Sequence, residues 1–160
     1  MLNVYEIPLV PGEWCVVDSE ASRPSDSHRQ QPRTTYHAFY FLDLPGYGFA
    51  RASQADRRAF HLLITHTLAR PGLTGVLWLL DIRHAPSADD RDMHELFAGR
   101  KTRVLAALTK SDKLPRGQRV SRERELREAL ALDDDQVILT SVRENEGIEE
   151  LRESIKRFVG

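Results

Sequence analysis

The alternation of short apolar runs with amphipathic segments constrains the fold of this chain more than any other feature. The run Val76–Ile82 is apolar on both faces, and Thr102–Leu108 has the same character. Such runs are typical of parallel strands that lie beneath helices. Tyr36–Leu44 predicts another buried strand, Gln136–Thr140 a last one, and Leu2–Val10, with its valines, isoleucine and tyrosine, a first one.

Amphipathic segments follow these runs and predict helices. In Gln54–Arg70 the apolar positions recur at helical spacing, with Ser53 as the predicted N-cap and Pro71 as the stop. Further helices are predicted at Ala88–Arg100, at Ser121–Leu132 with Ser121 as its cap, and at Ile148–Val159. Strands that alternate with helices predict an α/β sandwich with a mostly parallel sheet, whose ligands bind at the carboxyl ends of the strands.

Length and composition limit the classes to which the chain can belong. A chain of 160 residues fits one domain, so residues 1–160 are predicted to form a single domain. The net charge of −1 excludes a global basic field for nucleic acid and leaves a local basic patch open. The one cysteine excludes an internal disulfide and fits a reducing cytoplasm. No apolar run approaches membrane-spanning length, so we expect a cytoplasmic protein with no membrane partner.

Residues 12–35 differ in composition from the rest of the chain. Ser19–Thr35 contains a single hydrophobic residue, Ala21, so it cannot contribute to a core. Trp14–Asp18 is compatible with a short returning strand. The segment 12–35 is therefore predicted to be a flexible insertion between the first two strands.

Polar loops follow the predicted strands, and the first is Asp43-Leu44-Pro45-Gly46. An acid at a strand tip can hold Mg²⁺ through water. A glycine three residues further on can bring its N–H group against a γ-phosphate. Taken alone the pattern is weak, because a strand that ends in aspartate before a Pro-Gly turn is common.

The second loop is Thr109-Lys110-Ser111-Asp112. A carboxylate at Asp112 can accept two hydrogen bonds from N1–H and the N2 amino group of guanine, and adenine lacks this paired donor edge. The Lys110 stem can lie over the purine face, and the Thr109 hydroxyl can support neighbouring loops. The alternative interpretation is a solvated polar turn after a strand.

The third loop is Thr140-Ser141-Val142, with Gly147 at the start of the last helix. Backbone N–H groups here can donate to the guanine O6 atom. Alone this loop says little, because serine often precedes a helix. The three loops occur in order, each at a strand end, and together they predict a guanine-nucleotide-binding domain.

Four stretches of the sequence are similar to a known family. "DLPGYGFA", "LLDIRHAPSADDRDM", "LTKSDKL" and "TSVRENEGIEEL" resemble the EngB/YsxC (YihA) family of bacterial P-loop GTPases. The form T-K-x-D, with Thr109 where many GTPases have asparagine, also matches. The resemblance covers about residues 36–159.

The resemblance implies a three-layer P-loop GTPase-like sandwich that binds GTP or GDP with Mg²⁺ and hydrolyses GTP slowly. It also implies a role in assembly of the large ribosomal subunit, through that subunit or its rRNA, and in cell division and septation. It places the nucleotide at the same three loops. No catalytic residue is assigned, because the switch loops would position the attacking water.

The phosphate loop of such GTPases has no counterpart in this sequence, which contains no G-x-x-x-x-G-K-[ST]. The start "MLNVYEI" resembles the family strand that follows switch I. We therefore expect a sandwich that lacks the first strand, the phosphate loop and the first helix, with Met1 an internal methionine of a longer GTPase. The strands that end at Leu44 and Ile82 would then lack the partner between them, and nucleotide binding would be weakened.

Two alternatives remain open. The first is a nucleotide-deficient pseudo-GTPase, or truncated gene product, that acts only as a binding module. The second is a different enzyme class, which the sequence disfavours because it contains no G-x-S-x-G motif. His61 and His66 are also too far off a common helical face to form a metal pair.

Overall fold

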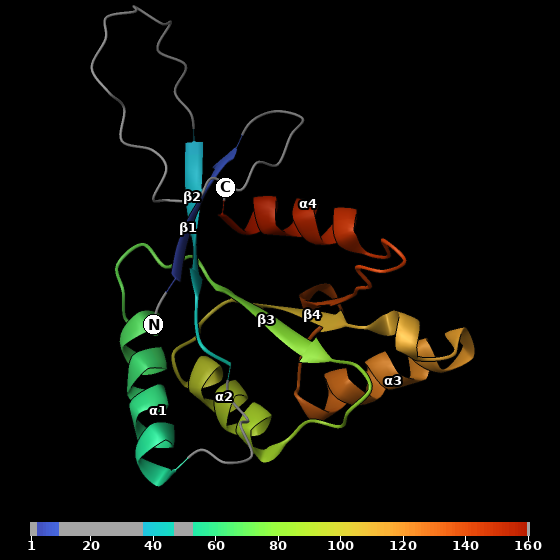
Figure 1. Cartoon of the computed structure of the whole chain (residues 1–160), viewed down its shortest axis with the longest axis horizontal. Helices are drawn as coiled ribbons and strands as arrows, with labels where there is room; N and C mark the ends of the chain where they lie inside the picture. Colours follow the sequence, from blue (N-terminus) through green and yellow to red (C-terminus); the bar gives the residue numbers. More distant parts are fainter. Residues whose placement is uncertain (1–2, 10–36, 47–52, 160) are drawn as a thin grey trace, which may run out of the picture. The chain divides into compact units, whose positions relative to one another are not determined.

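A computed structural model describes residues 3–9, 37–46 and 53–159 of the chain (Figure 1). The elements alternate between strand and helix along most of the chain, in the order that the sequence predicts. The chain divides into two compact units, Met1–Phe49 and Ala50–Gly160. The predicted insertion at 12–35, including the possible strand at Trp14–Asp18, lies outside the described residues.

The first unit contains an antiparallel hairpin. Strand β1 (Asn3–Leu9) pairs with β2 (His37–Asp43) over their full length, from Asn3 opposite Asp43 to Leu9 opposite His37. Both predicted strands are thus confirmed. The interpretation of Tyr36–Leu44 as a fully buried strand is wrong for one face, because Phe39 is buried while Tyr40 is 60% exposed. This alternation is the normal pattern of an antiparallel strand with one face covered.

The second unit is built on a parallel sheet. Strands β3 (Val76–Asp81), β4 (Val104–Thr109) and β5 (Val137–Leu139) lie in the order β3-β4-β5, with β4 between the others. All of β4 from Val104 to Leu108 is buried. The prediction of an α/β fold with a mostly parallel sheet is confirmed.

Strand β3 differs from its prediction on one face. Trp78 and Leu80 are buried, but Leu79, which points to the opposite face of the strand, is 62% exposed. Among the strands that the structure describes, β3 pairs only with β4, and β2 pairs only with β1.

Four α-helices accompany the sheet within the described residues. They are α1 (Gln54–Leu68), α2 (Ala88–Gly99), α3 (Arg116–Ala129) and α4 (Ile148–Val159). Figure 1 shows α4 on one face of the parallel sheet and α2 and α3 on the other, so the sheet forms a middle layer. None of the helices in the described part of the chain combines the length and the apolar character needed to cross a bilayer.

Helices α1 and α2 begin at reciprocal serine–aspartate caps. The Ser53 hydroxyl accepts a hydrogen bond from the Asp56 N–H, and the Asp56 carboxylate accepts one from the Ser53 N–H. Ser87 and Asp90 repeat this arrangement in α2. Each pair satisfies two backbone donors that a helix start would otherwise leave open. The predicted N-cap at Ser53 is confirmed.

Helix α3 begins earlier than the sequence suggests. Its first residue is Arg116, after Pro115, whereas the prediction placed the cap at Ser121. The Ser121 hydroxyl instead donates to the Gln118 carbonyl within the helix. Proline favours the start of a helix because its φ is fixed and it has no N–H to leave unpaired. The earlier start brings Arg119 into the helix on its buried side, with 7% of the residue exposed.

Helix α4 is fixed to the sheet through Phe158. The Arg103 guanidinium lies 4.3 Å from the centre of the Phe158 ring and donates a 3.2 Å hydrogen bond to the Phe158 carbonyl. A Cβ atom at Gly75 would collide with the ring, so only glycine fits beneath it. This contact holds the C-terminal helix against the start of β3 and β4.

Candidate functional site

The loop after β4 turns sharply at its second residue. Lys110 has a left-handed backbone with φ of 64°, and Ser111–Lys113 form a 3-10 turn. Few non-glycine residues adopt this conformation, which often occurs at functional sites. The Thr109 hydroxyl donates a 3.0 Å hydrogen bond to the Leu80 carbonyl, which ties the loop to β3.

Backbone hydrogen bonds join this loop to the one after β5. The Ser111 N–H donates to the Thr140 carbonyl at 3.1 Å, and the Thr140 N–H donates to the Leu108 carbonyl at 2.8 Å. Thr140, Ser141 and Ser111 are all buried. The structure therefore brings residues 109–112 and 140–142 together at the carboxyl ends of neighbouring parallel strands.

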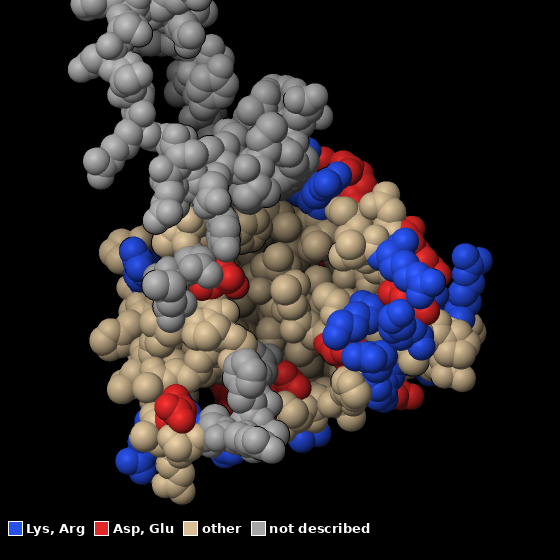
Figure 2. Space-filling view, in the orientation of Figure 1, with Lys and Arg blue, Asp and Glu red and all other residues tan. Residues whose placement is uncertain are grey.

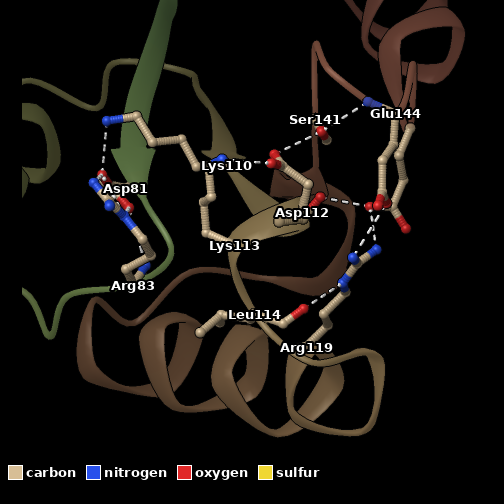
Figure 3. Close-up of polar contacts among 11 residues, drawn as sticks. Asp81, Arg83, Lys110, Asp112, Lys113, Leu114, Arg119, Ser141 and Glu144 are labelled. Carbon is tan, nitrogen blue, oxygen red and sulfur yellow. Dashed lines mark hydrogen bonds and ion pairs between the residues drawn. The ribbon is translucent and has the colours of Figure 1, made fainter.

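Asp112 is held at the centre of these two loops (Figure 3). The Ser141 hydroxyl donates a 2.8 Å hydrogen bond to Oδ1 of Asp112, and the Lys113 ammonium lies 3.3 Å from Oδ2. The Ser141 hydroxyl, followed by Lys113, lowers the pKa of Asp112 against the opposing effect of burial. The carboxylate is thus ionised at neutral pH, and an ionised carboxylate only accepts hydrogen bonds.

The loop from Ser141 to Glu146 closes on itself. Ser141 and Glu146 exchange two backbone hydrogen bonds of 3.0 Å, and the Glu144 N–H donates to the Ser141 hydroxyl at 3.1 Å. Gly147 follows with φ of +67°, and a Cβ there would collide with the Leu139 carbonyl oxygen. The side chain of Val142 is almost fully exposed, so packing does not explain its position at the loop.

Lys110 points toward the end of β3. Its ammonium lies 2.9 Å from Oδ2 of Asp81, and Arg83 binds the same carboxylate with hydrogen bonds of 2.9 Å and 2.7 Å. Arg83, helped by Lys110, holds the pKa of Asp81 far below its usual range. Asp81 and Arg83 were not among the predicted site residues, although both belong to the stretch that resembles the family.

Arg119 and Glu146 are a second pair that the sequence did not indicate. Arg119 lies in α3 and donates to Glu146 and to Glu144 at 2.8 Å and 3.1 Å. Glu146 also accepts a 2.5 Å hydrogen bond from the Ser111 hydroxyl. A buried arginine near two glutamates gives no signal in a hydrophobic pattern, because each of these residue types is normally found on the surface.

Residues 43–46 belong to the first unit, where Asp43 ends β2 and residues 44–46 follow it directly. Asp43, Pro45 and Gly46 are exposed and Leu44 is half-buried. A Cβ at Gly46 would meet no atom within 4 Å, so its backbone has open space beside it. In the described ranges, no three histidine, cysteine or acidic side chains are grouped to hold a metal ion by themselves.

Basic side chains gather on one side of the second unit. Figure 2 shows a cluster of lysine and arginine where Figure 1 places α3 and the loop after β4. Lys113 and Arg116 are among the exposed basic residues of this segment. A positive surface beside the two loops favours the approach of an anionic ligand.

A parallel sheet between helices, with polar loops at the carboxyl ends of its strands, defines an α/β domain whose candidate ligand site lies at those strand ends. A crystal structure of a probable GTP-binding protein EngB has this fold. It matches with a TM-score of 0.64 over 75% of this chain and 77% of that chain, at 18% identity. No family model matches the chain.

Curated relatives identify the family. The chain is 33% identical over 141 residues to the probable GTP-binding protein EngB of Geobacillus sp. strain WCH70, which covers 87% of this chain and 73% of that protein. It is 37% identical over 121 residues to the protein of the same name from Listeria welshimeri, covering 74% of this chain and 62% of that protein. The chain belongs to the EngB family of P-loop GTPases. It spans between 62% and 73% of the length of these two relatives.

Proposed function

We propose that this chain is a GTP-binding protein of the EngB type, which holds the base of GTP or GDP at the loops after β4 and β5. The observation that carries the proposal is the Asp112 carboxylate, ionised and fixed by Ser141 at 2.8 Å. A carboxylate in a fixed orientation can accept from both N1–H and the N2 amino group of guanine. The same group would face an acceptor at N1 of adenine, which selects against that base.

The other loop residues would complete the base site. The stem of Lys110 would lie along the purine face while its ammonium stays near Asp81. The backbone of Ser141 and Val142 would donate to O6. Thr109 would keep the loop in place through its hydrogen bond to Leu80.

The loop 43–46 would serve the phosphates. Asp43 would orient Mg²⁺ through water, and the N–H of Gly46 would contact the γ-phosphate, with Leu44 and Pro45 shaping the turn. Magnesium is usually held by one or two carboxylates together with phosphate oxygens and water, so a single exposed carboxylate fits this role. Bound Mg²⁺ would supply charge neutralisation for the phosphates.

We further propose that the chain forms one EngB-type domain over residues 1–160, with 12–35 as an insertion. It would act in the cytoplasm in assembly of the large ribosomal subunit and in normal cell division. The family supports this proposal, as do the exposed arginines Arg57 and Arg58 on α1, which could face rRNA phosphates. Arg51, a third candidate for this contact, lies outside the described residues.

The test is a titration of the full chain with GDP and ADP, followed by NMR because this method detects weak binding. We expect GDP, and not ADP, to shift the amides of Asp112 and Ser141. In Asp112→Asn the side chain can donate to the C2 carbonyl of xanthine, so preference should move from GDP to xanthosine diphosphate. Equal shifts with GDP and ADP would contradict the proposal.

A second candidate function is a binding module that keeps the fold without using nucleotide. The observation in its favour is that the sequence contains no G-x-x-x-x-G-K-[ST], the motif that cradles phosphates. The same titration separates the two candidates. A chain that folds normally and shows no shift with millimolar GDP would favour the binding module.

A further inference from the structure

Arg119 is a buried cation with three partners. Only 8% of its side chain is exposed. Its Nε donates to the Leu114 carbonyl at 3.2 Å, and its two terminal nitrogens donate to Glu146 at 2.8 Å and to Glu144 at 3.1 Å. Burying a guanidinium destabilises the folded state unless the group is paired and hydrogen-bonded. The three acceptors together therefore offset the cost of burying Arg119.

Glu146 links Arg119 to the loop after β4. Its Oε2 accepts from Arg119 and also from the Ser111 hydroxyl at 2.5 Å. The Ser111 hydroxyl, followed by Arg119, lowers the pKa of Glu146 against the effect of burial. Glu146 is therefore the shared acceptor between helix α3 and the residue that directly precedes Asp112.

A second path runs from Arg119 through Glu144. The Glu144 carboxylate accepts from Arg119, and the Glu144 N–H donates to the Ser141 hydroxyl at 3.1 Å. That hydroxyl donates in turn to Asp112. Arg119 is thus linked through Glu146 to the residue before Asp112, and through Glu144 to the residue that hydrogen-bonds Asp112. Figure 3 shows the path through Glu144 and Ser141.

We propose that Arg119 is a positioning residue that sets the orientation of the base-selecting carboxylate of Asp112, with Glu146 and Glu144 as its contacts to the two loops. This inference rests on the proposed function. Arg119 itself does not contact the nucleotide, and its effect reaches the base only through Ser111 and Ser141. Loss of Arg119 should therefore weaken the hydrogen bonds between Asp112 and the N1–H and N2 amino groups of guanine.

This mode of action has a signature that general loosening of the fold does not share. Inosine diphosphate differs from GDP only by lacking the N2 amino group, so it can form one hydrogen bond with Asp112 where GDP forms two. A misplaced carboxylate costs GDP more than it costs inosine diphosphate. A loosened fold weakens the binding of both nucleotides by the same factor.

The experiment measures dissociation constants of GDP and inosine diphosphate for the full chain and for three variants. In Arg119→Gln we expect the preference for GDP to fall by about tenfold, the loss of one hydrogen bond to a charged group. Arg119→Lys keeps the charge but cannot reach three acceptors at once. Its preference for GDP over inosine diphosphate should therefore lie between those of the wild type and Arg119→Gln. The matched control is Arg124→Gln, an exposed arginine of the same helix, which should keep the wild-type preference.

The outcomes separate this inference from the function on which it rests. Wild-type chain that does not prefer GDP over ADP overturns the proposed function and the inference together. The inference alone is overturned if the wild-type chain prefers GDP over ADP but Arg119→Gln leaves the preference for GDP over inosine diphosphate nearly unchanged. Nearly unchanged here means that the ratio of the two dissociation constants stays within about twofold of the wild-type ratio. If circular dichroism shows that Arg119→Gln is unfolded, Arg119→Lys decides by the same criterion.

Discussion

The Ser141 hydroxyl donates a 2.8 Å hydrogen bond to the Asp112 carboxylate, although the two residues are 29 positions apart in the sequence. They meet because β4 and β5 are parallel neighbours and both loops leave the same edge of the sheet. The bond uses a lone pair on Oδ1 of Asp112 and restrains the rotation of the carboxylate. Orientation is thus supplied by a residue that belongs to the same candidate site.

The first prediction concerns this hydrogen bond. Ser141→Ala removes the donor, so the pKa of Asp112 should rise toward its ordinary value and GDP should bind more weakly. The affinity for GDP should fall by about tenfold or more, as expected for the loss of a hydrogen bond to a charged group. An NMR pH titration of the Asp112 carboxyl and a GDP titration measure the two effects.

The control for this substitution is Ser121→Ala in α3. Its hydroxyl donates to a carbonyl within its own helix, and it is exposed. We expect no change in GDP binding for this variant. An unchanged pKa of Asp112 in Ser141→Ala would contradict the prediction.

The second prediction concerns Gly147. Its φ of +67° and the close approach of its Cα to the Leu139 carbonyl leave no room for a side chain. Gly147→Ala should destabilise the fold by about 2 kcal/mol or more, since it combines backbone strain with a clash. Urea denaturation measures the change in the free energy of unfolding.

Gly117 is the matched control for Gly147. It lies in α3, and a Cβ there would meet no atom within 4 Å. Gly117→Ala should stabilise the fold by about 0.5–1 kcal/mol, because alanine is the better helix former. Equal destabilisation by both substitutions would show that the tight approach at Gly147 is not the cause.

The third prediction uses two neighbouring leucines of β3. Leu80 is buried and Leu79 is 62% exposed. Leu80→Ala should lower the free energy of unfolding by about 2–4 kcal/mol, while Leu79→Ser should change it by less than about 1 kcal/mol. Thermal or urea denaturation compares them, and a large cost at Leu79 would mean that its face of the strand is covered in solution.

The fourth prediction concerns pH. Arg83 and Lys110 lower the pKa of Asp81, so the folded pKa lies below the unfolded one. Stability from this group is fully present above the unfolded pKa, about 4, and is lost as pH falls through the folded pKa. Asp81→Asn should therefore be less stable than wild type at pH 7, and the difference should shrink as pH drops below about 4.

Thermal melts of both proteins between pH 7 and pH 3 give this comparison. Asp92→Asn, at an exposed position of α2, is the control and should differ little from wild type at either pH. A difference between Asp81→Asn and wild type that stays constant with pH would contradict the prediction.

The sequence predicted the strands and helices well because their apolar residues follow the periods of these structures. β3, β4 and α4 lie where the apolar runs are, and the cap of α1 lies at the predicted serine. The start of α3 was wrong because Ser121 has the residue type of a cap, whereas the actual start depends on Pro115. Both residues are local signals for a helix start, and the sequence pattern did not decide between them.

The candidate site also contains residues that the sequence could indicate and residues that it could not. Residues next to strand ends, such as Asp112 and Ser141, could be named from the order of the motifs. Arg119 and Glu146 could not, because their role depends on contacts between segments that lie 25 or more positions apart. Burial of a charged residue arises only in the assembled fold, and no regular spacing in the sequence predicts it.

The left-handed backbone at Lys110 limits which residues can replace it. Branched side chains such as valine and isoleucine are disfavoured at φ of 64°, whereas glycine and asparagine are accepted readily. Glycine would relieve the backbone but lose the contact with Asp81, so the backbone conformation and the side-chain contact favour different residues at this position. A library of random substitutions at this position should thus give different results under two selections. Selection for folding alone should enrich glycine and asparagine, and selection for ligand binding should enrich lysine.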